Sequence, residues 1–340
     1  MKKQELKNLV STQLPLNQRI SGGALQSTLT AMAENLYCGC GGEGGGPEIP
    51  PPTEPSGTVR NIMTLFDMFP YTSQIYKNKI YMPSGVSTGM VIFDLLTETL
   101  TFLNTTYSCT ESQIWQDKLY MIRSSGRDLE IFDLQNETLR NTIFSISGAT
   151  RTSQIYQDKL YMPVANAGNI IRIFDLQTEI SRFVTPLNPM RIFTSQIWND
   201  RLYMPQNNNN TLEIFDFITE QIRTVNLPNN MGRVTSQIWQ DKLYILQDSG
   251  TILEIFDLQT ETTRSVTLPN RQRETSQIWQ DKLYLPSNGR FPTVLEIFDL
   301  QNETIETITL NGNSCLSSQI WNGRLYMLDY GGRDIKVYTL

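Results

Sequence analysis

Arginine and aromatic side chains gather in several short, irregular stretches of the chain. A guanidinium group forms paired hydrogen bonds to a carboxylate or a phosphate, and an aromatic ring beside it stacks on apolar surface. The candidate binding residues are Arg127, Arg233, Arg271, Arg273, Arg290, Arg333, Tyr71, Tyr107, Phe193, Phe291 and Tyr330. We predict that they recognise an acidic glycan or an acidic protein patch. The alternative is that these loops vary under no binding constraint.

The residues available for catalysis are few. The chain has no histidine, which removes the commonest general base, the commonest metal ligand and the usual partner of a serine or cysteine nucleophile. Cys38 and Cys40 lie in a glycine tract, while Cys109 and Cys315 stand alone, a spacing that favours free thiols over zinc ligands or disulfides. We also find no acid, base or metal cluster that departs from the repeat described below. These observations predict a protein that is not an enzyme and needs no cofactor or metal.

Charge and polarity exclude two further classes. The net charge of −6 and the pI near 5.0 give no basic surplus for nucleic acid. No apolar window of about 18 residues could span a membrane, and the start of the chain lacks the apolar run of a signal peptide. With 39% hydrophobic and 10% aromatic residues, we expect a folded protein made in the cytoplasm, without nucleic-acid partners or membrane insertion.

A repeat of about 40 residues organises most of the chain. The string S-Q-I followed by Trp or Tyr occurs seven times, beginning at Ser73, Ser112, Ser153, Ser195, Ser236, Ser276 and Ser318. Each unit has four short runs rich in β-branched and aromatic residues, such as TSQIWQ, DKLYMP, LEIFDL and ETTRSVTL, separated by turn residues. Four strands in a unit of this length are typical of a propeller blade.

The seventh repeat lacks a fourth strand, because the chain stops after IKVYTL. Residues 57–66, GTVRNIMTLF, match that strand and precede the first S-Q-I. We predict that they complete the last blade and close the ring, which removes exposed strand edges. The predicted organisation is a helical anchor at residues 1–40, a Gly/Pro-rich linker at 41–56 and an all-β, seven-bladed propeller at 57–340.

Three residue types recur at fixed positions of the repeat, which favours structural roles. We predict that the aromatic residue after S-Q-I packs between blades, and that the Asp of I-F-D forms the turn from the third to the fourth strand. The Gln of S-Q-I either satisfies backbone groups between blades or lines a channel for a ligand. These glutamines are Gln74, Gln113, Gln154, Gln196, Gln237, Gln277 and Gln319.

The two faces of the predicted propeller differ in sequence. One, here the repeat-turn face, carries the W-Q-D-K and D-L-Q-T-E-T turns, where 17 acidic residues stand against eight basic ones. The other, here the variable face, carries the loops between second and third strands and the blade-to-blade connections. Its nine basic residues are all arginine, against seven acidic ones, and its loops differ from blade to blade. Since a binding surface needs distinct groups at distinct places, we predict that the variable face binds the ligand.

The repeat resembles those of seven-bladed β-propellers, and KLYMP followed by LEIFDLQTET is similar to the second and third strands of a kelch-type blade. Kelch blades carry Gly-Gly after the second strand, where this chain has pairs such as Met82-Pro83 and Met204-Pro205. The resemblance therefore implies the architecture and not a kelch function. The S-x-D-x-G-x-T-W box of sialidases is absent, and the histidine expected of streptogramin-lyase-like propellers is missing.

The segment before the ring has a resemblance of its own. NQRISGGALQSTLTAMAENLY places Leu25, Leu29, Met32 and Leu36 in one apolar stripe of a helix. It is similar to the I-T-x-x-x-L-x-x-x-L-x-x-M segments near the amino termini of tail-fibre and head-fibre proteins of tailed bacteriophages. This resemblance implies a virion protein, made in the host cytoplasm, that is anchored to other virion proteins by this segment. Its propeller would then serve assembly or attachment to a host-surface glycan or protein.

Other readings remain open at this stage. The propeller could be a cellular scaffold for a protein partner, or a lyase-type enzyme with an unrecognised site. The amino-terminal helix could also fold back on the propeller rim instead of binding an assembly partner.

Overall fold

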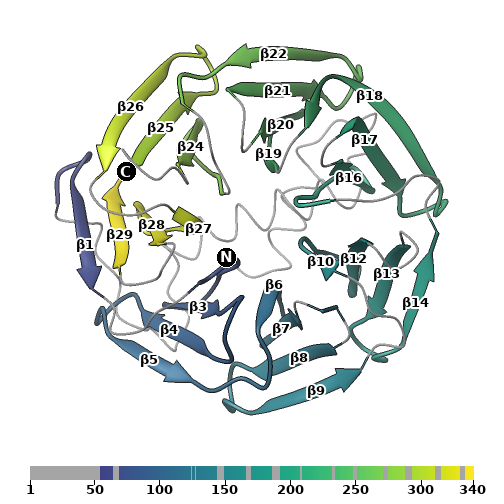
Figure 1. Ribbon diagram of the computed structural model, residues 1–340, viewed down its shortest axis with the longest axis vertical. Coiled ribbons are helices and arrows are strands. Elements are labelled where there is room, and N and C mark those ends of the chain that lie inside the picture. Colours follow the sequence, from purple (N-terminus) through teal and green to yellow (C-terminus); the bar gives the residue numbers. More distant parts are fainter. Residues whose placement is uncertain are drawn as a thin grey trace, which may run out of the picture.

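Seven antiparallel sheets stand around a central axis, which confirms the predicted seven-bladed β-propeller (Figure 1). The computed structural model describes residues 54–63, 69–123, 125–126, 128–143, 149–165, 170–185, 192–206, 209–231, 234–247, 251–270, 275–287, 293–310, 315–329 and 334–340. The predicted anchor residues Leu25, Leu29, Met32 and Leu36 lie outside this part of the chain, as do Cys38 and Cys40. Within it, no helix is long and apolar enough to cross a membrane.

Each blade runs from an innermost to an outermost strand, and we number the blades in chain order. Blade 1 contains β2 (Gln74–Tyr76), β3 (Lys79–Pro83), β4 (Met90–Asp94) and β5 (Leu100–Leu103). Blade 2 contains β6 (Cys109–Trp115), β7 (Lys118–Arg123), β8 (Asp128–Asp133) and β9 (Leu139–Ile143). Blade 3 contains β10 (Ala149–Thr150) and β11 (Gln154–Tyr156), which both pair with β12 (Lys159–Ala165), then β13 (Ile170–Asp175) and β14 (Ser181–Val184).

The remaining blades follow the same plan. Blade 4 contains β15 (Gln196–Trp198), β16 (Arg201–Pro205), β17 (Asn209–Asp216) and β18 (Ile222–Met231). Blade 5 contains β19 (Val234–Trp239), β20 (Lys242–Gln247), β21 (Ile252–Asp257) and β22 (Thr263–Thr267). Blade 6 contains β23 (Gln277–Trp279), β24 (Lys282–Pro286), β25 (Thr293–Asp299) and β26 (Ile305–Leu310). Blade 7 contains β27 (Cys315–Trp321), β28 (Arg324–Asp329), β29 (Asp334–Thr339) and, outermost, β1 (Val59–Met63).

Strand β1 closes the ring as predicted. It pairs with β29 in antiparallel register from Val59 opposite Tyr338 to Met63 opposite Asp334. Glu54, just before this strand, forms ion pairs with Arg60 at 3.1 Å and with Arg324 at 3.4 Å. The two ends of the described chain are therefore joined within one sheet.

The hydrophobic core lies between the blades. Each of seven clusters of buried side chains combines two neighbouring blades. In the seam between blades 2 and 3, for example, Tyr120 and Ile131 pack with Leu160 and Phe174. Because side chains alternate across a strand, one blade contributes to both of its seams. The aromatic residues after S-Q-I join these clusters one by one, which confirms their predicted packing: Tyr76, Trp115, Tyr156, Trp198, Trp239, Trp279 and Trp321.

The I-F-D aspartates form the turns to the fourth strands, as predicted. In blade 5, Oδ1 of Asp257 accepts the N–H groups of Gln259 at 3.0 Å and Thr260 at 2.8 Å. Equivalent bonds end on Asp94, Asp133, Asp175, Asp216 and Asp299. Because these donors favour the ionised carboxylate, they lower the pKa of all six residues.

Candidate functional site

Three of the eleven predicted binding residues lie in the described part of the chain: Tyr71, Tyr107 and Phe193. Each precedes the innermost strand of its blade, in the blade-to-blade connections that belong to the variable face. The other predicted residues, Arg127, Arg233, Arg271, Arg273, Arg290, Arg333, Phe291 and Tyr330, lie outside the described residues, so their placement stays a prediction.

Two of the three aromatic rings are covered by arginine. The guanidinium carbon of Arg123 lies 4.1 Å from the centre of the Tyr107 ring, and that of Arg151 lies 4.7 Å from the centre of the Phe193 ring. Arg123 is also paired with the buried carboxylate of Asp128, which fixes its position. Guanidinium and aromatic groups therefore lie together here through Arg123 and Arg151, which are not among the predicted binding residues.

The ring of Tyr71 packs against a glycine. It lies over Gly85, where an added Cβ would come within 1.8 Å of Cδ2. The N–H groups of Tyr71 and Gly85 both donate to the carbonyl oxygen of Phe69, at 3.0 and 2.9 Å. The tyrosine remains 38% exposed.

The glutamines of S-Q-I hold the blades together around the channel. Each side-chain amide donates to the backbone oxygen of the equivalent serine in the next blade, at 2.7–2.8 Å. The last bond, from Gln319 to Ser73, closes the circle. This confirms the structural interpretation of these residues; no ligand is needed to satisfy their amides.

A second circle, here the hydroxyl ring, runs beside the glutamines. In six seams the hydroxyl of the residue before S-Q-I bonds to the serine hydroxyl of the next blade, at 2.6–2.9 Å. The residues that supply it are Thr72, Thr152, Thr194, Thr235, Thr275 and Ser317. The pattern supplies one neutral link for each of these seams.

Glu111 takes this position in blade 2 and breaks the pattern. Its Oε1 accepts hydrogen bonds from the Ser153 hydroxyl of blade 3 at 3.1 Å and from the Gln113 amide at 3.2 Å. Burial dominates over these donors and raises the pKa of Glu111 to about 8. The expectation that no acid departs from the repeat is therefore wrong: aligning the residues before S-Q-I gives Thr, Glu, Thr, Thr, Thr, Thr and Ser, which would have shown Glu111.

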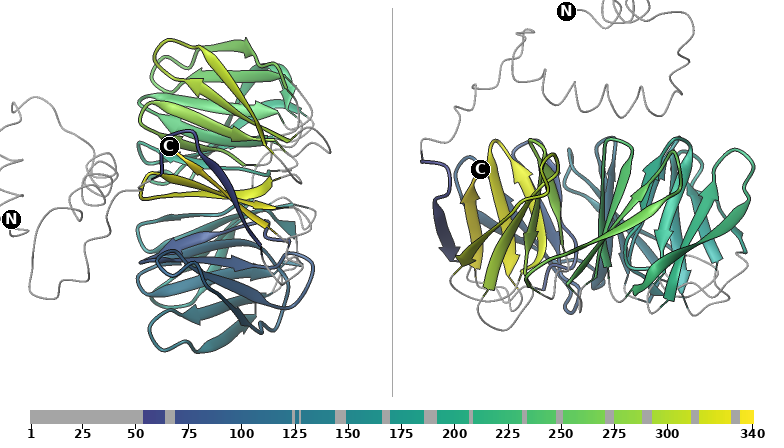
Figure 2. Two further views of the ribbon diagram at one scale, coloured as in Figure 1. Left: turned by 90° about the vertical axis from the view of Figure 1, so that its left-hand side faces the viewer. Right: turned by 90° about the horizontal axis from the view of Figure 1, so that it is seen from above.

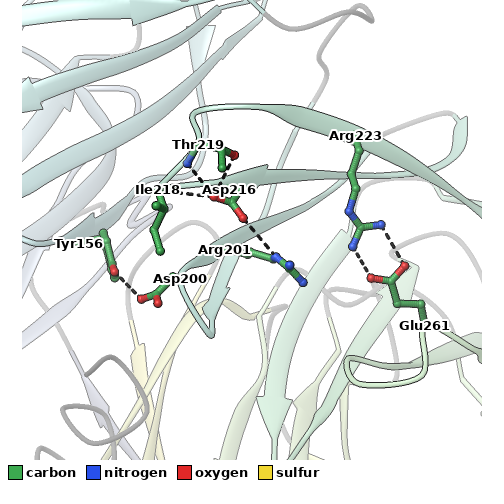
Figure 3. A network of polar contacts seen from close by, with 8 residues as sticks. All are labelled: Tyr156, Asp200, Arg201, Asp216, Ile218, Thr219, Arg223 and Glu261. Atoms are coloured by element: carbon green, nitrogen blue, oxygen red, sulfur yellow. Dashed lines mark hydrogen bonds and ion pairs between the residues drawn. The ribbon is translucent and has the colours of Figure 1, made fainter. Parts of the chain in front are cut away.

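Sequence reasoning also missed a set of ion pairs at the outer edge of the repeat-turn face. The arginine of a fourth strand pairs with the turn glutamate of the next blade, as Arg223 does with Glu261 (Figure 3). The other pairs are Arg60–Glu98, Arg140–Glu179, Arg182–Glu220 and Arg264–Glu303. The count of charged residues in the turns leaves out these five arginines, which lie in the fourth strands. It therefore overestimates the negative charge of the repeat-turn face.

The turns between first and second strands add a further link across the seams. The Tyr156 hydroxyl donates to Asp200 of the next blade (Figure 3), and the Trp115 and Trp239 indoles donate to Asp158 and Asp281 at 3.0 Å. Recurring polar groups on this face thus bond to neighbouring blades.

The glutamine bonds near the central axis and the arginine–glutamate pairs at the outer edge should differ in strength. Replacing Gln237 by Ala leaves the Ser276 carbonyl without its amide donor and should cost about 1–3 kcal/mol. Replacing Arg223 by Ala removes a largely exposed ion pair and should cost less than about 1 kcal/mol. Urea unfolding of the two variants checks this order. Equal losses would show that the amide circle does not dominate the polar contribution to blade contacts.

Buried charges on the third strands complete the polar groups of the interior. Glu254 of blade 5 accepts a bond from Asn229 near the end of β18, and Glu296 of blade 6 accepts a bond from Asn270 in the connection that leads into its blade. Lys336 pairs with Asp329 at 3.3 Å, with almost no exposure of either side chain.

Cys109 and Cys315 are buried free thiols whose pKa values are raised by burial. Among the described residues, no group of three or more acidic residues or cysteines could hold a metal ion.

Comparison with known proteins adds evidence on the fold alone. The sequence matches no protein-family model and no curated protein. A virginiamycin B lyase from Staphylococcus aureus superposes with a TM-score of 0.70 at 12% identity, over 83% of this chain and 99% of that chain. Its catalytically inactive variant with quinupristin, in which alanine replaces a histidine, gives 0.72 at 11% identity over the same shares. A chain of a mitotic checkpoint complex gives 0.66 at 13% identity, over 88% of this chain and 98% of that chain. At such identities, the shared feature is the β-propeller fold.

Proposed function

We propose that this protein is a non-enzymatic recognition module of a bacteriophage virion. Residues 1–40 attach it to other virion proteins through the linker at residues 41–56, and the variable face binds an acidic glycan or protein patch on the host. The observation that carries this proposal is the face of the propeller at which β1 begins.

That face is the repeat-turn face. Glu54 pairs with Arg324, which directly follows the turn between the first and second strands of blade 7. The N–H of Leu340 donates to Gly323 in the same turn at 2.9 Å. Figure 2 shows β1 starting at the same end of the blades as the C-terminus. A tether that joins the propeller at Glu54 therefore leaves the variable face directed away from the attachment point.

The distribution of polar contacts supports recognition by the variable face. Recurring Gln, Asp, Arg and Glu side chains bond within turns or between blades. The groups that differ from blade to blade stand on the variable face, where guanidinium groups lie on aromatic rings. This combination suits a ligand with both a negative charge and an apolar surface, such as an acidic sugar.

The alternative hypothesis, that the protein is a lyase-type enzyme, has less support. The inactive variant of the structurally similar lyase lacks a histidine, and this chain contains none. A shared fold at this identity does not carry over an activity. We therefore favour binding without catalysis.

Charge reversal tests the binding face. We expect the double variant Arg271→Glu, Arg273→Glu to lose at least about tenfold in affinity on an array of acidic glycans or for host cells, since two ion pairs become repulsive. Surface changes of this kind should alter stability by no more than about 0.5 kcal/mol. The matched control, Lys242→Glu with Lys282→Glu on the repeat-turn face, should bind normally. Binding that neither double variant nor added salt affects would refute an anion-binding variable face.

The tether has a separate test. A chain beginning at Glu54 should fold and bind the same glycans but fail to enter particles. Normal incorporation of that chain would refute attachment through residues 1–40.

A further inference from the structure

We propose that the seam between blades 2 and 3 is a proton-dependent joint of the propeller, closed while Glu111 is neutral and loosened when Glu111 loses its proton. The joint itself follows from the geometry of the channel. Only its consequence for ligand binding rests on the proposed function.

The first step of the argument is the position of Glu111 within a circle of neutral links. In the other six seams, a hydroxyl bonds to a hydroxyl, and neither group ionises over the physiological pH range. In this seam, the carboxyl group of Glu111 accepts a bond from the Ser153 hydroxyl, which is fully buried. One of seven otherwise similar joints can therefore change its charge.

The backbone directly before Glu111 is irregular, as it is before Ser317 in blade 7. The register of β6 with β7 shifts between Cys109 and Glu111, which marks a bulge at Thr110 immediately before the carboxylate. A bulge redirects the side chains that follow it. Across the seam, Ser153 lies between β10 and β11, where the inner strand of blade 3 is interrupted. The pairing of β6 with β7 is unbroken from Glu111 onward, whereas Ser153 lies outside the paired residues of blade 3.

No counter-charge from the described residues stabilises the ionised form. The groups that contribute to the pKa of Glu111 are burial, the Ser153 hydroxyl and N–H, and the Gln113 amide, all of them neutral. The cation on the facing segment, Arg151, has its guanidinium on the Phe193 ring, toward blade 4. On its own blade, Arg123 lies on Tyr107 and pairs with Asp128. An ionised Glu111 would therefore be a partly buried charge that none of these groups compensates, and water must solvate it at the inner end of the seam.

The rest of the seam limits the opening to its inner end. Trp115 still bonds to Asp158 at the repeat-turn end, and Arg140 pairs with Glu179 at the outer edge. At the variable end, the Thr110 hydroxyl donates to the Thr150 carbonyl at 3.0 Å, beside the connections that carry Tyr107 and Arg151. Loosening of the inner end, beside these connections, is the step that would couple pH to the recognition face.

Hydrogen exchange of the full-length protein tests the joint without any ligand. Exchange is measured by mass spectrometry at about pH 6 and about pH 9.5, with labelling times scaled to the intrinsic rates, so that differences report opening. Residues 110–115 and 149–156 report the seam between blades 2 and 3. Residues 192–198 and 235–239 report the equivalent seam between blades 4 and 5, as an internal control. We expect protection to fall at least about tenfold in the first seam and to stay unchanged in the second.

Two variants separate the carboxylate from other effects of pH. Glu111→Thr installs the hydroxyl used by most of the other seams, and Glu111→Gln keeps the shape without the titration. Both should abolish the pH dependence. Equal protection of the two seams in the unmodified protein at high pH, or pH dependence that persists in Glu111→Gln, would overturn the proposal. These outcomes do not depend on glycan binding or particle assembly, so failure of the joint is distinct from failure of the proposed function.

Discussion

A chain that begins at residue 64, and therefore lacks β1, should unfold at a temperature at least about 10 °C below that of a chain beginning at Glu54. The removed strand pairs with β29 over five residue positions. Val59 packs in the seam between blades 6 and 7, and Ile62 packs in the seam between blades 7 and 1. Arg60 joins the strand to Glu98 of blade 1. One deletion therefore weakens two seams and exposes a new sheet edge.

The size of the effect follows from these losses. Two partly buried aliphatic side chains, one strand of backbone hydrogen bonds and one ion pair together should contribute about 5 kcal/mol or more. A folded domain has only about 5–15 kcal/mol to lose, so a melt without a cooperative transition is also consistent with the expectation. Differential scanning calorimetry of the two truncations measures the difference directly.

The substitution Glu54→Ala provides the matched control. It removes the contacts of Glu54 with Arg60, Arg324 and Thr339 but leaves β1 in place. We expect a loss of about 1 kcal/mol for these partly exposed contacts. Equal melting temperatures for the chains beginning at Glu54 and at residue 64 would contradict closure by β1.

The repeated features of this fold were predictable from the sequence because each has a local cause. The I-F-D aspartate forms its turn with the two following N–H groups, whatever the blade. The alternation of side chains places the S-Q-I aromatic residues between blades. Because the last repeat lacks a fourth strand, the sequence alone predicted that residues 57–66 pair with the third strand of that repeat.

The missed features all cross a seam. Arg223 and Glu261 are 38 positions apart and belong to different repeats, so examining one repeat at a time does not pair them. Glu111 stood among the acidic residues of a variable stretch, and its role is apparent only when it is aligned with Thr72, Thr152 and Thr194. Contacts between repeats, rather than patterns within one, decide the chemistry of a propeller channel.

The unmodified protein should lose stability between about pH 4.5 and about pH 8 through Glu111, whereas Glu111→Thr should not. The folded state raises the pKa of this carboxyl from 4.5 to about 8. The contribution of Glu111 to the stability of the folded protein is thus complete below its pKa in the unfolded chain. It is lost as the pH rises through its pKa in the folded protein. The difference corresponds to about 5 kcal/mol at full ionisation. At about pH 9, Glu111→Thr should therefore be the more stable protein by several kcal/mol, and near pH 4.5 the two should agree within about 1 kcal/mol.

Urea unfolding across this range measures the difference between the two proteins, so contributions shared by both, such as those of the turn aspartates, cancel. A transplant provides the control. Thr235 occupies the position of Glu111 in blade 5 and bonds to Ser276 as Glu111 bonds to Ser153. Introducing Thr235→Glu into the Glu111→Thr protein should restore the loss of stability toward high pH, now at the seam between blades 5 and 6. A stability difference between Glu111→Thr and the unmodified protein that is constant with pH would show that Glu111 is ionised in the folded protein throughout, and that the seam tolerates its charge.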